Sequence, residues 1–248
     1  MPNAAYHLAK PAPHSTSVVF ASPHSGRDYP NSFLSQTTLN RHSVRSSEDA
    51  FVDRLFADAP KYGAPLITAR VPRAFVDMNR SCEELDTALI KGVRRARHNP
   101  RVASLLYLLP QVISNSQAIY ADPMTAAEAE RRITSYWRPY HEALKTQLNQ
   151  SDTLFGRAIL VECHSMPHEA MDAIARSGTR RPEIVLGDRF GTTAGDDTVD
   201  GIETAFVAAG LVVARNTPFA GAYITQQYGR PALGRHAVQI EIDRALYM

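Results

Sequence analysis

The residues best suited to chemistry occur in short polar clusters, each beside the end of an apolar run. These clusters are residues 23–26, 48–49, 77–80, 162–165 and 239–241. Together they supply imidazoles, carboxylates and an adjacent Asn-Arg pair. Imidazole and carboxylate groups bind divalent metals, and an arginine can hold a substrate carboxylate. The set therefore predicts metal-assisted hydrolysis of an amide in an anionic substrate.

Two histidines, His24 and His164, each follow an apolar run that we expect to be a strand. In open α/β sheets, ligands bind beyond the carboxyl ends of strands, so both histidines fall where a site is expected. Either one alone would more often be a structural residue. As a pair at two strand ends, with carboxylates available, they are predicted to be metal ligands.

A third ligand should be a carboxylate, because two neutral imidazoles leave most of the charge of a dication uncompensated. Asp49 and Glu48 are adjacent candidates, and we favour Asp49. The alternative is that they cap a helix predicted to start there. Glu162 lies two residues before His164, hence on the same face of a strand, and is expected to support a ligand rather than to bind metal itself.

Glu241 is the candidate general base. It lies inside the apolar run 236–242, where a carboxylate is costly unless it has a partner or a task. Near a metal site it could accept a proton from water and pass it to a leaving amine. The alternative is an exposed residue on an edge strand.

Asn79 and Arg80 are the candidates for binding an anionic group of the substrate, because the guanidinium fork matches a carboxylate. Arg73, Arg138 and His141 are weaker candidates for the same pocket, and a surface salt bridge is the alternative for each arginine. Residues 219–229, which include Tyr223 as a further candidate substrate contact, are glycine-rich and aromatic. The glycine and aromatic content of this stretch predicts either a lid that excludes water or an ordinary tight loop.

The alternation of apolar runs and helical patterns predicts the fold class. Strands are expected at residues 17–21, 64–69, 158–163, 183–186, 211–214 and 236–242, and helices at 48–61, 125–150 and 197–209. Thr125 and Glu128 form a capping-box pattern at the start of the second helix. We predict one α/β domain over residues 1–248, with a mixed, mainly parallel sheet flanked by helices. Residues 79–123 and 216–235 are expected to leave the sheet and form active-site walls.

Composition limits the class of protein further. The chain has 248 residues, 44% of them hydrophobic, a formal charge of +2 and two cysteines. It lacks an apolar run long enough to span a bilayer, so we expect a soluble, cytoplasmic protein. A basic stretch contains Arg94, Arg95, Arg97 and Arg101. No interleaved aromatic residues accompany it, so we expect a solvated surface and no nucleic-acid partner.

The short motifs occur in an order that resembles the N-formylglutamate amidohydrolase family, also called N-formylglutamate deformylases, which is itself similar to zinc carboxypeptidases. The matching stretches are residues 23–26, Asp49 with Val52 and Leu55, 73–80, 137–141, 164–166, 187–188, 223–225, 228–229 and 236–241. The resemblance implies a phosphorylase/hydrolase-like fold and one zinc, or another divalent metal, at His24, Asp49 and His164. It also implies that Asn79 and Arg80 bind the substrate carboxylate and that Glu241 activates water.

The reaction that the resemblance implies is hydrolysis of N-formyl-L-glutamate to formate and L-glutamate, a step of histidine degradation. Residues 221–222 read Gly-Ala where the family usually has two glycines, and residues 81–123 are less similar than their flanks. These segments are expected to line the side-chain pocket, so the acyl amino acid stays open. The alternatives are a carboxypeptidase-like hydrolase with another substrate and a non-catalytic protein that binds an anionic amino-acid derivative.

Two other enzyme classes are disfavoured. A non-haem iron oxygenase also uses two histidines and a carboxylate, but its short His-x-Asp spacing is missing and helix-strand alternation does not suit a jelly roll. A serine hydrolase would need a Gly-x-Ser-x-Gly turn, which the chain lacks. The oligomeric state does not follow from the sequence.

Overall fold

The computed structural model describes residues 4–86, 88–91, 107–113, 117–172 and 180–248. The basic stretch with Arg94, Arg95, Arg97 and Arg101 lies outside these residues. The chain divides into two compact units. The first unit contains Met1–His7, Pro23–Glu48 and Thr68–Ala143, and the second contains Leu8–Ser22, Asp49–Ile67 and Leu144–Met248. The prediction of a single domain over residues 1–248 stays a prediction.

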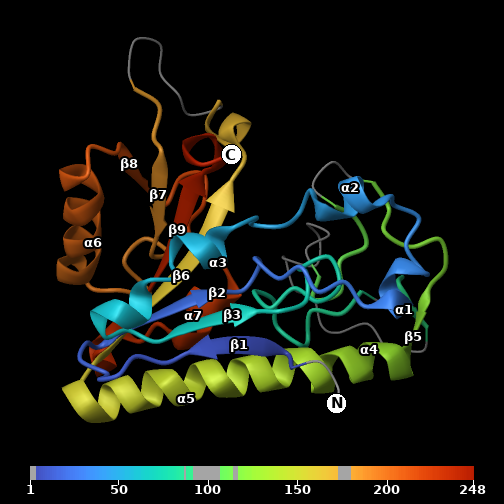
Figure 1. The fold of residues 1–248 in the computed structure, drawn as a ribbon, viewed down its shortest axis with the longest axis horizontal. Coiled ribbons are helices and arrows are strands. Elements are labelled where there is room, and N and C mark those ends of the chain that lie inside the picture. The colour runs from blue at the N-terminus through green and yellow to red at the C-terminus, as the bar shows by residue number, and fades with distance from the viewer. Residues whose placement is uncertain (1–3, 87, 92–106, 114–116, 173–179) are drawn as a thin grey trace. The chain divides into compact units, whose positions relative to one another are not determined.

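A seven-stranded sheet dominates the second unit (Figure 1). Its order is β1 (Tyr6–Ala9), β3 (Leu66–Ala69), β2 (Val18–Ser22), β6 (Ala158–Met166), β9 (Arg235–Asp243), β7 (Ile184–Gly187) and β8 (Val213–Arg215). Strand β6 is parallel to both β2 and β9, β7 is parallel to β8, and β7 and β9 are antiparallel. This confirms the predicted mixed, mainly parallel sheet and all six predicted strands. Of the seven strands in this sheet, only β1 was not predicted.

The two central strands, β6 and β9, separate apolar from polar side chains. Ile159, Val161 and Cys163 of β6 join Val238 and Ile240 of β9 in one buried cluster. Helices α3 (Val52–Leu55) and α6 (Asp196–Ala208) contribute Val52 and Val199 to the same cluster. Since side chains alternate along a strand, the intervening polar residues of both strands point to the opposite face. The alternation therefore places Glu162 and His164 of β6 on the same face of the sheet as Glu241 of β9.

The predicted helix over residues 48–61 is wrong. The backbone begins a helix only at Val52, because Phe51 has a left-handed φ of 65°. Helix α3 ends at Leu55, and a 3-10 turn follows at Ala59–Tyr62. Pro60 cannot donate the hydrogen bond that would continue the helix, and its ring crowds the carbonyl four residues before it. Asp49 therefore lies in an irregular segment rather than at a helix cap.

The other helical segments agree better with the sequence. The predicted helix over 125–150 forms α4 (Ala126–Arg132), a π turn (Ile133–Trp137) and α5 (Arg138–Phe155). Thr125 caps α4 by accepting a hydrogen bond from the Glu128 amide at 3.2 Å. Residues 219–229, predicted to be a lid or a loop, contain helix α7 (Tyr223–Tyr228). Among the described residues, no helix is long and apolar enough to cross a membrane.

Short elements complete the described chain. They are α1 (Asn31–Leu34), α2 (Arg41–Arg45), the parallel pair β4 (Ile90–Lys91) and β5 (Met124–Thr125), and 3-10 turns at His168–Met171, Pro231–Leu233 and Arg244–Leu246.

A fully buried arginine organises the core of the first unit. The Arg132 side chain has no solvent exposure, and its guanidinium lies 4.1 Å from the centre of the Phe75 ring. It donates hydrogen bonds to Glu128 at 2.7 Å and to the Tyr120 hydroxyl at 2.7 Å. The charge is tolerated inside the protein because these groups and the aromatic face replace water.

We expect Arg132→Ala to lower the free energy of unfolding by about 3–5 kcal/mol, because it leaves the buried partners of the guanidinium unpaired. Arg131→Ala is the matched control. Arg131 also binds Glu128, but its side chain is 44% exposed, so its loss should cost less than about 1 kcal/mol. Urea unfolding followed by circular dichroism measures both changes. Similar losses for the two variants would contradict a special role for Arg132.

Candidate metal centre

His24 belongs to the first unit and lies two residues after the end of β2. A side chain at Gly26 would overlap the backbone carbonyl of Val71, so the turn that carries His24 needs a glycine there. The His24 side chain is buried, and its Nε2 lies 2.7 Å from Asp77 Oδ1. Because an ionised carboxylate can only accept, Nε2 donates the proton and Nδ1 carries the lone pair of the neutral ring. The Asp77 contact therefore selects Nδ1 as the nitrogen that can bind metal.

Asp77 is the centre of a small network in the first unit. Its Oδ1 also accepts from the Asn79 amide at 2.8 Å, and its Oδ2 accepts from Arg73 at 2.9 Å. Burial by itself would raise the pKa of Asp77, but Arg73, His24 and Arg80 hold that pKa well below its usual value. The carboxylate is therefore ionised. The sequence analysis named the 77–80 cluster but gave Asp77 no role. The available signal was an acid next to an apolar run, with two arginines nearby.

Asp49 and His164 meet within the second unit. His164 Nδ1 lies 2.8 Å from Asp49 Oδ2, and His164 Nε2 lies 2.8 Å from Glu162 Oε1. Burial would lower the pKa of His164, but the carboxylates of Glu162 and Asp49 raise it well above its usual value. An environment that favours positive charge on this ring also suits a bound cation. The contact with Nε2 agrees with the supporting position predicted for Glu162.

The second oxygen of Asp49 has its own partners. Asp49 Oδ1 lies 3.3 Å from Arg244 Nη2 and 3.4 Å from the hydroxyl of Ser165. Arg244 also donates to the Ser165 hydroxyl at 3.1 Å, so these two side chains hold each other and the carboxylate. The orientation leaves Oδ2 facing His164. The sequence analysis included Ser165 in the cluster 162–165 but gave it no role, and it did not name Arg244, because only the fold brings Arg244 to Asp49.

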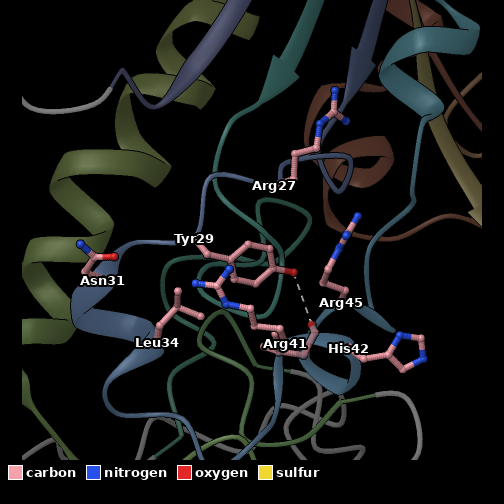
Figure 2. A pocket seen from close by; sticks show the side chains of 8 residues that line it. Arg27, Tyr29, Asn31, Leu34, Arg41, His42 and Arg45 are labelled. Atoms are coloured by element: carbon pink, nitrogen blue, oxygen red, sulfur yellow. Dashed lines mark hydrogen bonds between the residues drawn. The ribbon is translucent and has the colours of Figure 1, made fainter.

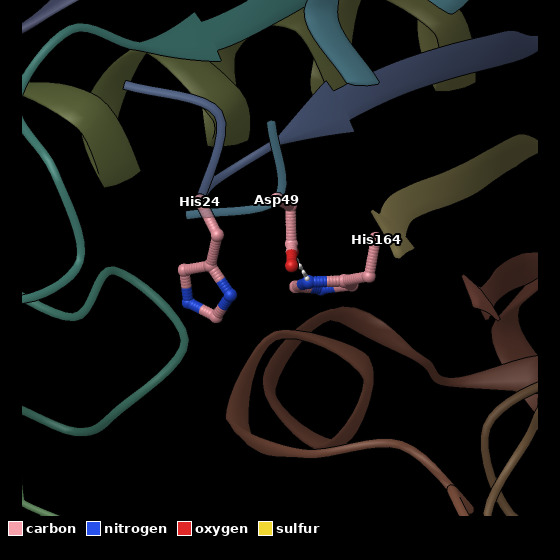
Figure 3. A group of neighbouring side chains, drawn as sticks. All are labelled: His24, Asp49 and His164. Atoms are coloured by element: carbon pink, nitrogen blue, oxygen red, sulfur yellow. Dashed lines mark hydrogen bonds and ion pairs between the residues drawn. The ribbon is translucent and has the colours of Figure 1, made fainter. Parts of the chain in front are cut away.

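One group of candidate metal-binding side chains emerges from the described residues: His24, Asp49 and His164. Each offers a ligand atom, these atoms lie within 4.8 Å of one another, and all three residues are buried (Figure 3). Two imidazole nitrogens and a carboxylate oxygen form a donor set that suits zinc and several other divalent metals. These are the three residues predicted as ligands.

Glu48, the alternative carboxylate, has other partners. Its Oε1 accepts a hydrogen bond from the Tyr29 hydroxyl at 2.6 Å and another from Arg45 at 3.1 Å. These contacts lie within the first unit. The geometry therefore favours Asp49 over Glu48 as the third ligand.

Glu241 lies beside His164 across the sheet. The two residues are in register on the parallel strands β6 and β9, so their side chains leave the sheet on the same face. Glu241 is 8% exposed, and its Oε1 accepts a hydrogen bond from Gln239 at 2.8 Å. Strand β9 lies between β6 and β7, which excludes the alternative of an edge-strand position.

The backbone around Asn79 and Arg80 is anchored by two aromatic side chains of the first unit. Trp137 Nε1 donates to the Arg80 carbonyl at 2.8 Å, and His141 Nε2 donates to the Met78 carbonyl at 2.9 Å. The Trp137 and His141 rings lie 4.2 Å apart, centre to centre. Asn79 and Arg80 themselves are buried. The hydrogen bonds from Trp137 and His141 therefore fix the backbone that carries Asn79 and Arg80.

The weaker candidates occupy different environments. Arg73 binds Asp77, and Arg138 lies 3.6 Å from Glu130 with a side chain that is 56% exposed. His141 contacts backbone, as described above. Tyr223 is the first residue of α7, a helix that packs against β9. Arg73, Arg138 and Tyr223 stay predictions as substrate contacts.

Comparisons with known proteins agree on one family. The family model for N-formylglutamate amidohydrolase matches residues 16–248. An N-formylglutamate deformylase of Pseudomonas aeruginosa is 28% identical over 207 residues, which cover 81% of this chain and 70% of the relative. One of Pseudomonas putida is 25% identical, with 93% and 81% covered. The crystal structure of an N-formylglutamate amidohydrolase from Ralstonia eutropha JMP134 has a TM-score of 0.90 and 35% identity, covering 99% of this chain and 88% of that one.

The burial of His141 predicts a pH dependence of stability. Burial lowers the pKa of His141 from 6.5 to about 4, so between these values the unfolded chain takes up a proton that the folded protein does not. Stability should therefore fall as the pH drops from about 6.5 to about 4, by up to about 3 kcal/mol. Urea unfolding at several pH values measures the slope.

His141→Gln keeps a donor for the Met78 carbonyl but does not titrate, so its stability should depend less on pH over this range. His42→Gln, at an exposed position, is the control and should keep the wild-type slope. An unchanged slope in His141→Gln would show that other groups cause the dependence.

Proposed function

Because the chain belongs to the N-formylglutamate amidohydrolase family, we propose that it is a metal-dependent amidohydrolase that cleaves the amide of an N-acyl amino acid. The expected substrate is N-formyl-L-glutamate, and the products are formate and L-glutamate. The observation that carries the proposal is the convergence of His24, Asp49 and His164, with Glu241 in register beside His164. From the family resemblance we also propose that the reaction serves histidine degradation in the cytoplasm.

The donor set fits a divalent cation. His24, Asp49 and His164 would hold it, and the proposed occupancy is one zinc per chain, with other divalent metals as acceptable substitutes. A bound cation would supply Lewis acidity, polarising the acyl carbonyl and making a water molecule more acidic. Asp77 supports His24, while Arg244 and Ser165 support Asp49, so each of these two ligands has a partner that sets its orientation.

Glu241 is proposed as the general base. Its carboxylate would take a proton from the attacking water and later deliver it to the nitrogen of the leaving amino acid. Gln239 holds one carboxylate oxygen at 2.8 Å, which restricts the side chain. The retention of this acid on the same face as the candidate ligand His164 favours an enzyme over a non-catalytic binding protein.

Asn79 and Arg80 are proposed to bind a carboxylate of the substrate. Arg80 supplies charge and Asn79 a neutral donor, and both lie on backbone anchored by Trp137 and His141. Fixing the substrate by its carboxylate would hold the scissile amide in one orientation, which lowers the entropic cost of reaching the transition state. A carboxypeptidase-like hydrolase would use the same residues but release an amino acid other than glutamate.

Glu241→Gln should lower the rate of formate release from N-formyl-L-glutamate about 100-fold or more, because the amide cannot accept the proton. Its metal content should stay that of the wild type. His164→Ala is the comparison and should lose both activity and metal. Elemental analysis and a formate assay, with and without chelator, measure both properties. Retention of most activity by Glu241→Gln would show that another group is the base.

Asp77→Asn should weaken metal retention about 10- to 100-fold, because an amide does not hold the His24 ring in the required tautomer as a carboxylate does. Zinc competition with a fluorescent chelator measures the affinity. Asp28→Asn is the matched control, since Asp28 also forms an ion pair with an arginine of the first unit, at 2.7 Å from Arg70, but is 40% exposed. Equal zinc affinities for Asp77→Asn and the wild type would show that Asp77 does not support the metal centre.

A further inference from the structure

Each unit contains a pocket with a basic lining. The pocket of the first unit, about 630 Å³, lies within residues 27–45 and is lined by Arg27, Arg41 and Arg45 (Figure 2). Its Arg45 already binds Glu48, at 3.1 Å. The pocket of the second unit is smaller, about 260 Å³, and its lining includes a hydrogen-bond donor that has no acceptor in the described part of the chain. The smaller pocket is therefore the stronger candidate for a ligand site.

The smaller pocket lies at the opposite end of the sheet from the candidate metal ligand His164. All of its lining residues belong to the second unit. Ala158 and Arg235 line it and are in register at the starts of the parallel strands β6 and β9. His164 and Glu241 are in register near the ends of the same strands. His236, which also lines the pocket, is separated from Glu241 by about 16 Å along β9. The pocket is therefore a place distinct from the proposed reaction centre.

His236 supplies the donor that has no protein acceptor. Its Nδ1 accepts a hydrogen bond from the Gly195 amide at 3.0 Å. A ring nitrogen that accepts is unprotonated, so the neutral ring carries its proton on Nε2. Among the described residues, no acceptor binds this second nitrogen. Because His236 lines the pocket, its Nε2–H group can donate to an oxygen of a ligand.

Three cationic side chains and no acidic one line the pocket. Arg235 is neutralised by Asp152 at 2.7 Å. The Lys145 ammonium forms no ion pair with a carboxylate in the described part of the chain. Arg230 donates through Nη1 to the Gln226 carbonyl at 2.8 Å, and it too has no carboxylate partner among the described residues. The lining therefore has an excess of positive charge, which suits an anion.

The donors suit a phosphate group better than a carboxylate. Lys145 is on α5, Arg230 follows α7 and His236 is on β9, so the three donors come from three elements. A phosphate group offers an oxygen to each donor, whereas a carboxylate has only two oxygens. Burial raises the pKa of Tyr228, another lining residue, so its hydroxyl stays neutral and does not repel an anion. Leu148 adds apolar surface that a short organic part of a phosphate monoester can cover.

We propose that this pocket binds a phosphate group, as inorganic phosphate or as a small phosphate monoester, through Lys145, Arg230 and His236. The inference does not depend on the proposed function, because the pocket shares no residue with the candidate metal centre. The hydrogen bonds with Gly195 and Gln226 hold His236 and Arg230 in place before a ligand binds. Binding therefore requires little further ordering of these two side chains.

Titration calorimetry tests the site, with inorganic phosphate and glycerol phosphate added to the metal-loaded protein at an ionic strength held constant with sodium chloride. One saturable site per chain is expected. Lys145→Gln and His236→Asn should each weaken binding about 10- to 100-fold, the cost of losing a hydrogen bond to a charged group. An asparagine side chain can still accept from the Gly195 amide, so His236→Asn removes mainly the Nε2 donor. Arg54→Gln, at an exposed position of the same unit outside the pocket, should keep the wild-type affinity.

The two compounds distinguish the sources of phosphate. Tighter binding of glycerol phosphate would identify an ester as the occupant, and equal or weaker binding would identify free phosphate. No saturable binding of either compound, or wild-type affinity in Lys145→Gln or His236→Asn, would overturn the inference. Removing the metal with a chelator should leave the affinity unchanged. An affinity that is lost with the metal would show that phosphate binds at the metal centre instead.

Discussion

The buried contacts of His164 are the interaction on which the proposed catalytic centre depends. This one imidazole lies between the carboxylates of Asp49 and Glu162, each 2.8 Å away, in a region closed to solvent. Ionisable groups cannot stay in such a place without opposite charges or a metal, because desolvation is costly. The contact holds an irregular segment against the end of β6. The sheet thus orients His164, and the hydrogen bond from His164 orients Asp49.

In the first unit, the buried carboxylate of Asp77 holds the imidazole of His24 in a similar way. A single buried carboxylate contacts His24, Arg73 and the Asn79 amide, so one acid links a candidate ligand to the proposed substrate-binding segment. Trp137 and His141 hold the backbone of that segment from the other side. The proposed metal site and the proposed carboxylate site therefore share supporting residues. A change in this network should therefore affect both properties together.

The charged side chains near the proposed metal centre fall into separate groups. The proposed metal centre has two candidate supporting acids, Asp77 and Glu162, whereas the pocket around Arg27 and Arg41 is lined by cationic groups. Glu48 and Asp49 illustrate the separation: they are adjacent in sequence, yet Glu48 contacts Tyr29 and Arg45, and Asp49 contacts His164.

Local pattern was sufficient for most of the fold and for the identity of the candidate ligands. Apolar runs placed the main strands within a few residues, and the Thr125 cap was visible from its spacing to Glu128. The predicted helix over residues 48–61 is wrong partly because of Pro60, which is visible in the sequence, and partly because Phe51 has a left-handed backbone conformation. That conformation depends on how the segment packs and not on its own propensity, so a sequence pattern could not reveal it.

The amino-acid sequence by itself determined the order of strands and helices along the chain, the polar clusters at strand ends, and hence His24, Asp49, His164 and Glu241 as candidates. Only the tertiary structure decided their partners. Asp77 is 53 residues from His24, and Arg244 is 195 residues from Asp49. Such pairings, like the choice of Asp49 over Glu48, depend on which distant charges the folded chain brings together. Local periodicity contains no information about contacts of that range.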